Sequence, residues 1–393
     1  MTQYGAHTSD SGRPDVGKSP FRDRRRRASV DKRPRNRSHQ SHYPYHLPQS
    51  DGESISITFL SEGSFNKVYR IEDIRDGELY IMRIALPVDR FHEPSAEVAT
   101  LLCSKERTDM PVAKVIAYDA SSSNEIGFEW VLMSFLPGVS LAICYLGLPV
   151  EQKQKIVQQM AYYMAQMFRL QFNEMGSLRK TEDGYSMGRM VNQVFWWYKR
   201  VHAPIRKGPF KTVQNWVGAQ IHFMLDEAGK LFAKDTESHL DWETDYEILV
   251  TNASRTNTSL PELLERIEPP SSDASGNLLT ALTHADLGEH NVLVDPITCE
   301  ITGIIDWENV STHPLALACQ IPLLLDPTGL PREQASDIDE HADASDDEED
   351  EMKERQLWEC QAYDRKLLEH QHVGLRDYFL QEMEKICPQW VKE

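Results

Sequence analysis

Alternating apolar and polar positions predict several short strands in the first third of the chain. The alternation runs through residues 55–60, 67–71 and 79–86, and each run is bounded by small or polar residues. Residues 130–136 form a more continuous apolar run that ends at Pro137-Gly138, as a buried strand before a break would. These runs predict an N-terminal β-sheet.

Helical spacing takes over elsewhere. Residues 94–102 have proline in their first turn and an apolar face, which predicts one helix after the third strand. Residues 151–270 are predicted to be mainly helical, and helices at 357–363 and 367–383 complete the chain. One apolar stripe with helical spacing is expected to lie in the core: Val157, Met160, Ala161, Met164 and Phe168.

A hairpin is predicted between residues 292–295 and 300–305. Both runs are rich in β-branched residues, and a turn containing Pro296 separates them. Asn291 precedes the first strand and Asp306 follows the second, so their side chains should emerge at the same end of the hairpin. Two hard oxygen ligands in that position suit Mg²⁺ when ATP phosphates and water complete its coordination.

Asp286 lies five residues before Asn291, and this spacing suits ATP-dependent phosphoryl transfer. Such a reaction needs one carboxylate to orient and deprotonate an attacking hydroxyl, and an amide with a second carboxylate to hold magnesium on ATP. A simpler explanation is that Asp286 and Asn291 form turns and that Asp306 caps a helix. We favour the catalytic interpretation, because the simpler one does not explain the hairpin between Asn291 and Asp306.

Residues 284–307 resemble the catalytic and metal-binding segment of the aminoglycoside phosphotransferase and choline kinase superfamily. This superfamily is the small-molecule branch of the protein-kinase-like fold, and the resemblance continues in landmarks over residues 53–325. It implies an α+β fold of two lobes. Residues 51–136 would be an N-lobe with an antiparallel sheet and one helix, and residues 137–393 a larger, mainly helical C-lobe.

The resemblance also assigns residues that would contact ATP. The loop with Gly63, Ser64 and Asn66 would cover the triphosphate. Arg83 stands where protein kinases carry a lysine that contacts phosphate, and choline kinases resemble this chain in using arginine there. Glu97 would be its ion-pair partner. An ordinary hairpin loop, an exposed strand arginine and a solvated helix glutamate are the simpler explanations of these residues.

The same resemblance implies an adenine site. Backbone groups near Ser134 and Phe135 would hydrogen-bond the base, and Leu293 and Ile305 would line it. Asp286 would be the catalytic base, with Asn291 and Asp306 as magnesium ligands.

Trp307 and Glu308 stand where protein kinases have phenylalanine and glycine. This departure favours a small-molecule kinase over a protein kinase, because it suggests a fixed segment without an activation loop. A non-catalytic nucleotide-binding or scaffolding protein that keeps the fold is the competing hypothesis. Arg83 and the glycine-poor loop support it, whereas the intact Asp286, Asn291 and Asp306 oppose it.

Charge is unevenly distributed along the 393 residues. Residues 1–50 hold eleven Lys and Arg against four Asp and Glu, so their net +7 leaves −26 for the rest of a chain whose total is −19. This basic segment is predicted to be a disordered tail, as is an acidic insertion at about 333–355. The acidic remainder favours a cationic acceptor with a hydroxyl group through electrostatic steering.

Composition predicts a cytoplasmic enzyme that binds no nucleic acid, and the basic tail is also compatible with nuclear import. The six cysteines are scattered and show no C-x-x-C spacing, which argues against a disulfide framework and a zinc site. The apolar stretch from Trp130 to Leu148 is interrupted by Pro137-Gly138, so no membrane span is expected. Nothing in the sequence identifies the acceptor or the oligomeric state.

Overall fold

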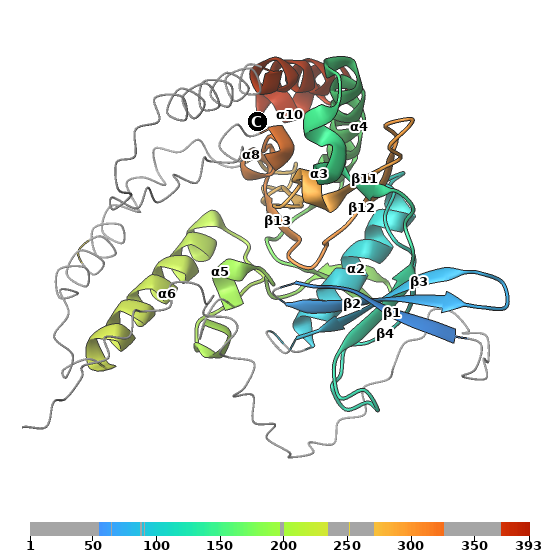
Figure 1. Cartoon of the computed structure of the whole chain (residues 1–393). Helices are drawn as coiled ribbons and strands as arrows, with labels where there is room; N and C mark the ends of the chain where they lie inside the picture. Colours follow the sequence, from blue (N-terminus) through green and yellow to red (C-terminus); the bar gives the residue numbers. More distant parts are fainter. Residues whose placement is uncertain are drawn as a thin grey trace, which may run out of the picture.

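The structure is a computed structural model (Figure 1). It describes residues 55–63, 65–86, 89, 91–196, 200–234, 251, 271–325 and 371–393. The predicted basic tail (1–50), the acidic insertion (about 333–355), the helix at 357–363 and Ser64 all lie outside the described residues.

The N-terminal strands form one antiparallel sheet with the order β1-β2-β3-β5-β4. Its members are β1 (Ile55–Glu62), β2 (Asn66–Asp73), β3 (Leu79–Ala85), β4 (Val115–Asp119) and β5 (Trp130–Ser134). The four strands predicted from sequence all lie in this sheet, with ends that differ by two residues or fewer. Helix α2 (His92–Arg107) packs on β4 and β5 and buries Val98 and Leu101, which confirms the helix predicted at 94–102.

The predicted hairpin is confirmed as part of a second, three-stranded sheet with the order β12-β11-β6. Strand β11 (Val292–Val294) pairs antiparallel with β12 (Ile301–Ile304), and Val292 faces Ile304. Strand β6 (Val139–Ser140) follows the Pro137-Gly138 break and pairs with β11. The chain that leaves the N-terminal sheet therefore joins the hairpin directly.

Helices dominate the remainder. They are α3 (Leu141–Cys144), α4 (Val150–Arg169), α5 (Gln193–Trp196), α6 (Val213–Lys234), α8 (Leu315–Ala318), α10 (Pro388–Lys392) and a helix at 371–386. In Figure 1, α3, α4, α8 and α10 lie above the N-terminal sheet, whereas α5 and α6 lie to its left. The predicted stripe on α4 lies in the core or against it, and Met160 and Ala161 are fully buried. A third sheet consists of β7 (Gln171–Phe172), β10 (Thr280–Thr283) and β13 (Ser311–Pro314).

One hairpin lies inside the region that was predicted to be mainly helical. Strands β8 (Leu178–Thr181) and β9 (Gly184–Met187) pair antiparallel, and Gly184 has a φ of +136°. Asp-Gly is a turn signal, and here Asp183 ends the two-residue loop while Gly184 begins β9 and adopts its positive φ without strain. The helical spacing of the neighbouring segments obscured this signal at Asp183-Gly184.

The molecule is thus a two-lobed, protein-kinase-like α+β fold, as the resemblance implied. Residues Trp130–Leu148 form β5, β6, α3 and the 3₁₀ turn η2 (Tyr145–Gly147) instead of one long helix. Among the helices in the described ranges, none combines the length and the apolar composition that a membrane crossing requires.

Candidate active site

The segment after β10 is held in place by His284. This side chain is buried, and its Nε2 donates a hydrogen bond to the carbonyl oxygen of Ile305 at 3.0 Å. Its Nδ1 accepts the backbone N–H of Asp286 at 3.4 Å, and its ring meets Trp307 edge-on at 5.1 Å. Burial lowers the pKa of His284, which favours the neutral ring that these two hydrogen bonds require. His284 therefore joins the segment before Asp286 to the end of the hairpin.

Asp286 and Asn291 are hydrogen-bonded to each other. The Asn291 Nδ2 group donates to the Asp286 carboxylate at 2.9 Å and to the Asp286 carbonyl oxygen at 2.8 Å. Asn291 is buried in the 3₁₀ turn η4 (Glu289–Asn291), whereas Asp286 is exposed. Because both amide protons of Asn291 are engaged, its Oδ1 is the atom left for a cation.

Asp306 lies beside Asn291 at the open end of the hairpin. The backbone N–H of Ile305 donates to the Asn291 carbonyl oxygen at 3.0 Å, which fixes the two strand ends together. Asp306 has a φ of +66°, a left-handed conformation that aspartate tolerates better than most residues. Its side chain keeps contact with solvent. Even so, desolvation by the surrounding protein, together with the smaller effect of the Glu308 charge, raises the pKa of Asp306 to about 6.

This donor set fits Mg²⁺. It offers the amide oxygen of Asn291 and the carboxylate of Asp306, both hard ligands, from the two adjacent ends of the hairpin strands. A dication would also stabilise the ionised form of Asp306 against the desolvation that raises its pKa.

Arg83 lies in a buried cluster of carboxylates. Its Nη1 donates to Glu308 at 2.7 Å, and its Nη2 donates to Glu97 and lies 3.7 Å from Glu93. The structure thus brings Arg83 and Glu97 together, as the resemblance implied. It adds Glu93 and Glu308, which the sequence analysis did not place at the site. The Asn66 amide also donates to Glu308, so one carboxylate joins the start of β2, strand β3 and the segment after Asp306.

Burial dominates the electrostatics of this cluster. Desolvation raises the pKa of Glu97 to about 7, although Arg83 opposes that shift. Desolvation likewise raises the pKa of Glu93. Burial alone would lower the pKa of Arg83, but Glu97, Glu308 and Glu93 together raise it above its usual value. The guanidinium therefore stays charged among carboxylates that do not all ionise readily.

The loop between β1 and β2 contacts the C-lobe. Gly63 donates its N–H to the Asn66 carbonyl oxygen at 2.9 Å, which closes a tight turn. Phe65 packs edge-on against Trp196 of α5, with ring centroids 4.6 Å apart. The loop is therefore held at Asn66 by Glu308 and at Phe65 by Trp196. Ser64 lies outside the described residues.

The N–H groups of Ser134 and Phe135, near which the resemblance places the adenine contact, are hydrogen-bonded within the protein. The N–H of Ser134 donates to the Lys114 carbonyl oxygen at 2.9 Å, and that of Phe135 donates to the Leu79 carbonyl oxygen at 3.2 Å. Both amides are engaged in the sheet, so an adenine contact here depends on carbonyl oxygens or on the next amide, that of Leu136.

Leu293 is part of the β11 strand, and its side chain flanks Gly303 together with that of Leu136. Ile305 is half-buried between β12 and Asp306. Both apolar side chains that were predicted to line the base therefore lie on the hairpin that carries the metal-ligand candidates.

A comparison with protein families identifies the group to which the chain is related. The model of the phosphotransferase enzyme family matches residues 56–317. The chain belongs to this family. The matched range includes the N-terminal sheet, the hairpin and every candidate site residue of this phosphotransferase-family protein.

Curated proteins that are similar in sequence share about a quarter of the aligned residues with this chain. A subtelomeric hrmA-associated cluster protein of Aspergillus fumigatus is 26% identical over 305 residues, which are 68% of this chain and 60% of that protein. Altered inheritance of mitochondria protein 9 of Meyerozyma guilliermondii is 25% identical over 236 residues, 57% of this chain and 36% of that protein. The matches therefore span less than two thirds of these relatives.

Two solved structures have a similar course of the chain. The aminoglycoside phosphotransferase APH(4)-Ia is 17% identical with a TM-score of 0.40, over 86% of this chain and 94% of that one. An ethanolamine kinase of Plasmodium vivax is 13% identical with a TM-score of 0.40, over 85% of this chain and 73% of that one.

Proposed function

We propose that this protein is an ATP- and Mg²⁺-dependent phosphotransferase that moves the γ-phosphate to a hydroxyl group of a small molecule. Family membership supports the reaction class. The observation that carries the proposal is the bonding of Asn291, which joins Asp286 to the hairpin end at Asp306. These hydrogen bonds would hold the base and the two magnesium ligands close to one another.

Each of these side chains has a separate role. Asp286 would accept the proton of the acceptor hydroxyl. One of its oxygens is bonded to Asn291, and its Oδ1 has no partner in the described part of the chain. Asn291 Oδ1 and the Asp306 carboxylate would hold the cation. Bound Mg²⁺ would neutralise charge on the phosphates and orient them. His284 would keep the segment before Asp286 aligned with the hairpin.

Arg83 would supply positive charge near the phosphates, positioned by Glu97. Its two terminal nitrogens bond carboxylates, and Glu308 also accepts from Asn66, at the end of the loop that would cover the phosphates. Phosphate oxygens would therefore share or displace the contacts of Glu308. This makes Glu308 part of the nucleotide site in our proposal.

The second candidate is a non-catalytic nucleotide-binding or scaffolding protein. It is favoured by the carboxylates that occupy both terminal nitrogens of Arg83 and by the engaged amides of Ser134 and Phe135. We rank it lower, because a protein that had lost catalysis would have no need to keep Asp286, Asn291 and Asp306 in their bonded arrangement.

The acceptor and the location of the protein stay predictions. The acidic charge outside residues 1–50 supports a cationic acceptor, such as an amino alcohol or an aminoglycoside. A cytoplasmic location was expected from sequence, but several relatives carry the name of a mitochondrial protein. Mitochondria are therefore the alternative location, and fractionation of cells that express the tagged full chain would decide between them.

The test of the proposal is ATP turnover by the full chain with a panel of amino alcohols and aminoglycosides. We expect Mg²⁺-dependent ADP release with at least one acceptor. The Asp286→Asn variant should be slower by about 10²–10⁴-fold, the usual effect of removing a general base. Asp306→Ala should lose turnover as well. Normal phosphate transfer by Asp306→Ala would show that the metal assignment is wrong, and nucleotide binding without turnover on any acceptor would favour the second candidate.

A further inference from the structure

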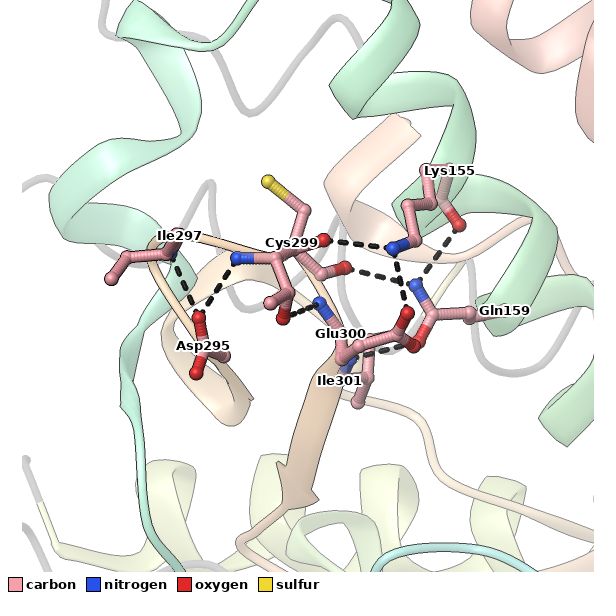
Figure 2. A network of polar contacts seen from close by, with 8 residues as sticks. Lys155, Gln159, Asp295, Ile297, Cys299, Glu300 and Ile301 are labelled. Atoms are coloured by element: carbon pink, nitrogen blue, oxygen red, sulfur yellow. Dashed lines mark hydrogen bonds and ion pairs between the residues drawn. The ribbon is translucent and has the colours of Figure 1, made fainter.

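The turn that joins β11 to β12 is bonded to helix α4 (Figure 2). Within the turn, the Asp295 carboxylate accepts the N–H groups of Ile297 and Thr298, each at 2.8 Å. Cys299 then adopts a left-handed conformation with a φ of +58° and donates its N–H to the Asp295 carbonyl oxygen at 2.9 Å. The turn thus has one defined conformation at the end opposite to Asn291 and Asp306.

Gln159 of α4 contacts this turn through both ends of its amide group. Its Nε2 donates to the Cys299 carbonyl oxygen at 2.9 Å, and its Oε1 accepts the N–H of Ile301 at 2.8 Å. The side-chain amide therefore pairs with the backbone as a neighbouring strand would (Figure 2). A third bond, from Nε2 to the Lys155 carbonyl oxygen at 3.1 Å, fixes the amide on its own helix.

Lys155 adds a second, weaker contact. Its ammonium group donates to the Thr298 carbonyl oxygen at 2.8 Å and lies 2.6 Å from the Glu300 carboxylate. Both side chains are substantially exposed, so solvent screens this ion pair and its contribution is small. Gln159 is half-buried, so solvent weakens its hydrogen bonds to the turn less than it weakens the Lys155 contact.

Strand β12 is an edge strand, and two groups outside the sheet satisfy its buried backbone. Gln159 accepts the N–H of Ile301, and the carbonyl oxygen of Pro111 accepts that of Ile304 at 2.9 Å. Both strand residues are buried, so an unpaired N–H there would be costly. Gln159 thus fixes the start of the strand whose end leads to Asp306.

We propose that Gln159 is a positioning residue for the metal site. It sets the register and orientation of β12 from outside the sheet, and thereby the spacing of Asp306 from Asn291. This inference rests on the proposed function, because it concerns the same magnesium site. Groups that hydrogen-bond metal ligands directly are commonly worth about 10- to 100-fold in metal affinity, and Gln159, which acts through β12, is expected at the lower end of that range.

The test compares three variants of the full chain by calorimetric titration with the ATP analogue AMP-PNP at a series of Mg²⁺ concentrations. Gln159→Leu keeps the size of the side chain and removes both contacts with the turn. Gln159→Glu keeps an acceptor for the Ile301 N–H but loses the donor to Cys299. Gln158→Leu is the matched control, because Gln158 is an exposed neighbour on α4 whose side chain donates to Glu382, a different partner from the hairpin turn that Gln159 bonds.

We expect Gln159→Leu to raise the Mg²⁺ concentration for half-maximal binding by at least about tenfold. AMP-PNP affinity in EDTA should stay within about twofold of wild type, since the metal is then absent. Gln159→Glu should lie between, and Gln158→Leu should match wild type. A Gln159→Leu protein with a lower melting temperature but an unchanged Mg²⁺ requirement would overturn the inference, because the residue would then be merely structural. Absence of Mg²⁺-dependent binding in wild type would instead overturn the proposed function and remove the site that Gln159 is said to position.

Discussion

Gly138 lies where the segment from the N-lobe joins the hairpin, and we predict that it does not tolerate a side chain. Its φ is +113°, in a region that residues with a Cβ rarely adopt. A Cβ there would overlap Thr302 Oγ1 and lie 2.7 Å from the Val294 carbonyl oxygen. The Val294 oxygen belongs to the backbone of β11 and cannot move without disturbing that strand, whereas Thr302 Oγ1 can rotate away only by giving up its hydrogen bond to the Pro137 carbonyl oxygen.

The cost of Gly138→Ala has two parts. The backbone conformation costs about 1–3 kcal/mol for a residue other than glycine. Relief of the two short contacts adds about 1–3 kcal/mol, as overpacking does in other proteins. A domain of this size loses about 2–4 °C of melting temperature per kcal/mol. The two costs sum to about 2–6 kcal/mol, so the variant should melt roughly 4–24 °C below wild type, and its affinity for Mg²⁺-ATP should fall because the hairpin is displaced.

Substitutions at two other glycines separate the backbone cost from the contact cost. All variants are compared by their melting temperatures, measured by calorimetry or fluorescence. Gly127 has a φ of +76°, and a Cβ added there would meet no atom within 4 Å, so Gly127→Ala carries the backbone cost alone. Gly218 lies in α6 with ordinary φ and open space, so Gly218→Ala should be neutral or slightly stabilising. Thr302→Ala combined with Gly138→Ala should recover only part of the loss, since the Val294 contact stays. Equal melting temperatures for Gly138→Ala and Gly127→Ala would refute the reasoning.

Substitutions at three further positions test other contacts by urea or thermal unfolding. Arg83→Met should destabilise by about 3–5 kcal/mol, because it leaves buried carboxylates without their cation; an effect below about 1 kcal/mol would contradict the cluster. Trp307→Phe should cost about 1 kcal/mol by removing the indole bond to the Ile304 carbonyl oxygen at 2.8 Å, and Trp307→Ala about 3–5 kcal/mol; equal losses in the two variants would contradict the separation of hydrogen bonding from packing. Arg189→Met removes the partner of buried Asp89 at 2.6 Å. Burial already raises the pKa of Asp89 against the opposing charge of Arg189, so its protonated form is favoured on folding. The variant should therefore lose less stability at pH 5 than at pH 7, and a larger loss at pH 5 would contradict that sign.

Much of the fold and the site could be predicted from sequence because the signals are local. Alternation marked the strands of the N-terminal sheet, and the spacing of Asn291 and Asp306 around two β-rich runs marked the hairpin. The resemblance supplied Arg83 with Glu97, and the structure brings these two side chains into contact. The role of each residue in catalysis and in nucleotide binding stays a prediction.

What sequence could not supply depends on contacts between distant segments. Glu308 lies 225 residues from Arg83 and 242 from Asn66, and no local pattern indicates that it joins them. A charged residue between buried Trp307 and Val310 was the available signal. Gln159 has an ordinary helical setting, and only the packing of α4 against the turn reveals its contacts.

The most direct test of the central claim is the melting temperature of the full chain with ATP, with and without Mg²⁺, in wild type and in Asp306→Asn. Binding at about 100 times the dissociation constant stabilises by about 2.7 kcal/mol, which a melting experiment resolves easily. We predict a rise with ATP that becomes larger when Mg²⁺ is added in wild type, and loss of that Mg²⁺-dependent part in Asp306→Asn. No rise in wild type at millimolar nucleotide, or an unchanged Mg²⁺-dependent rise in Asp306→Asn, would contradict the account.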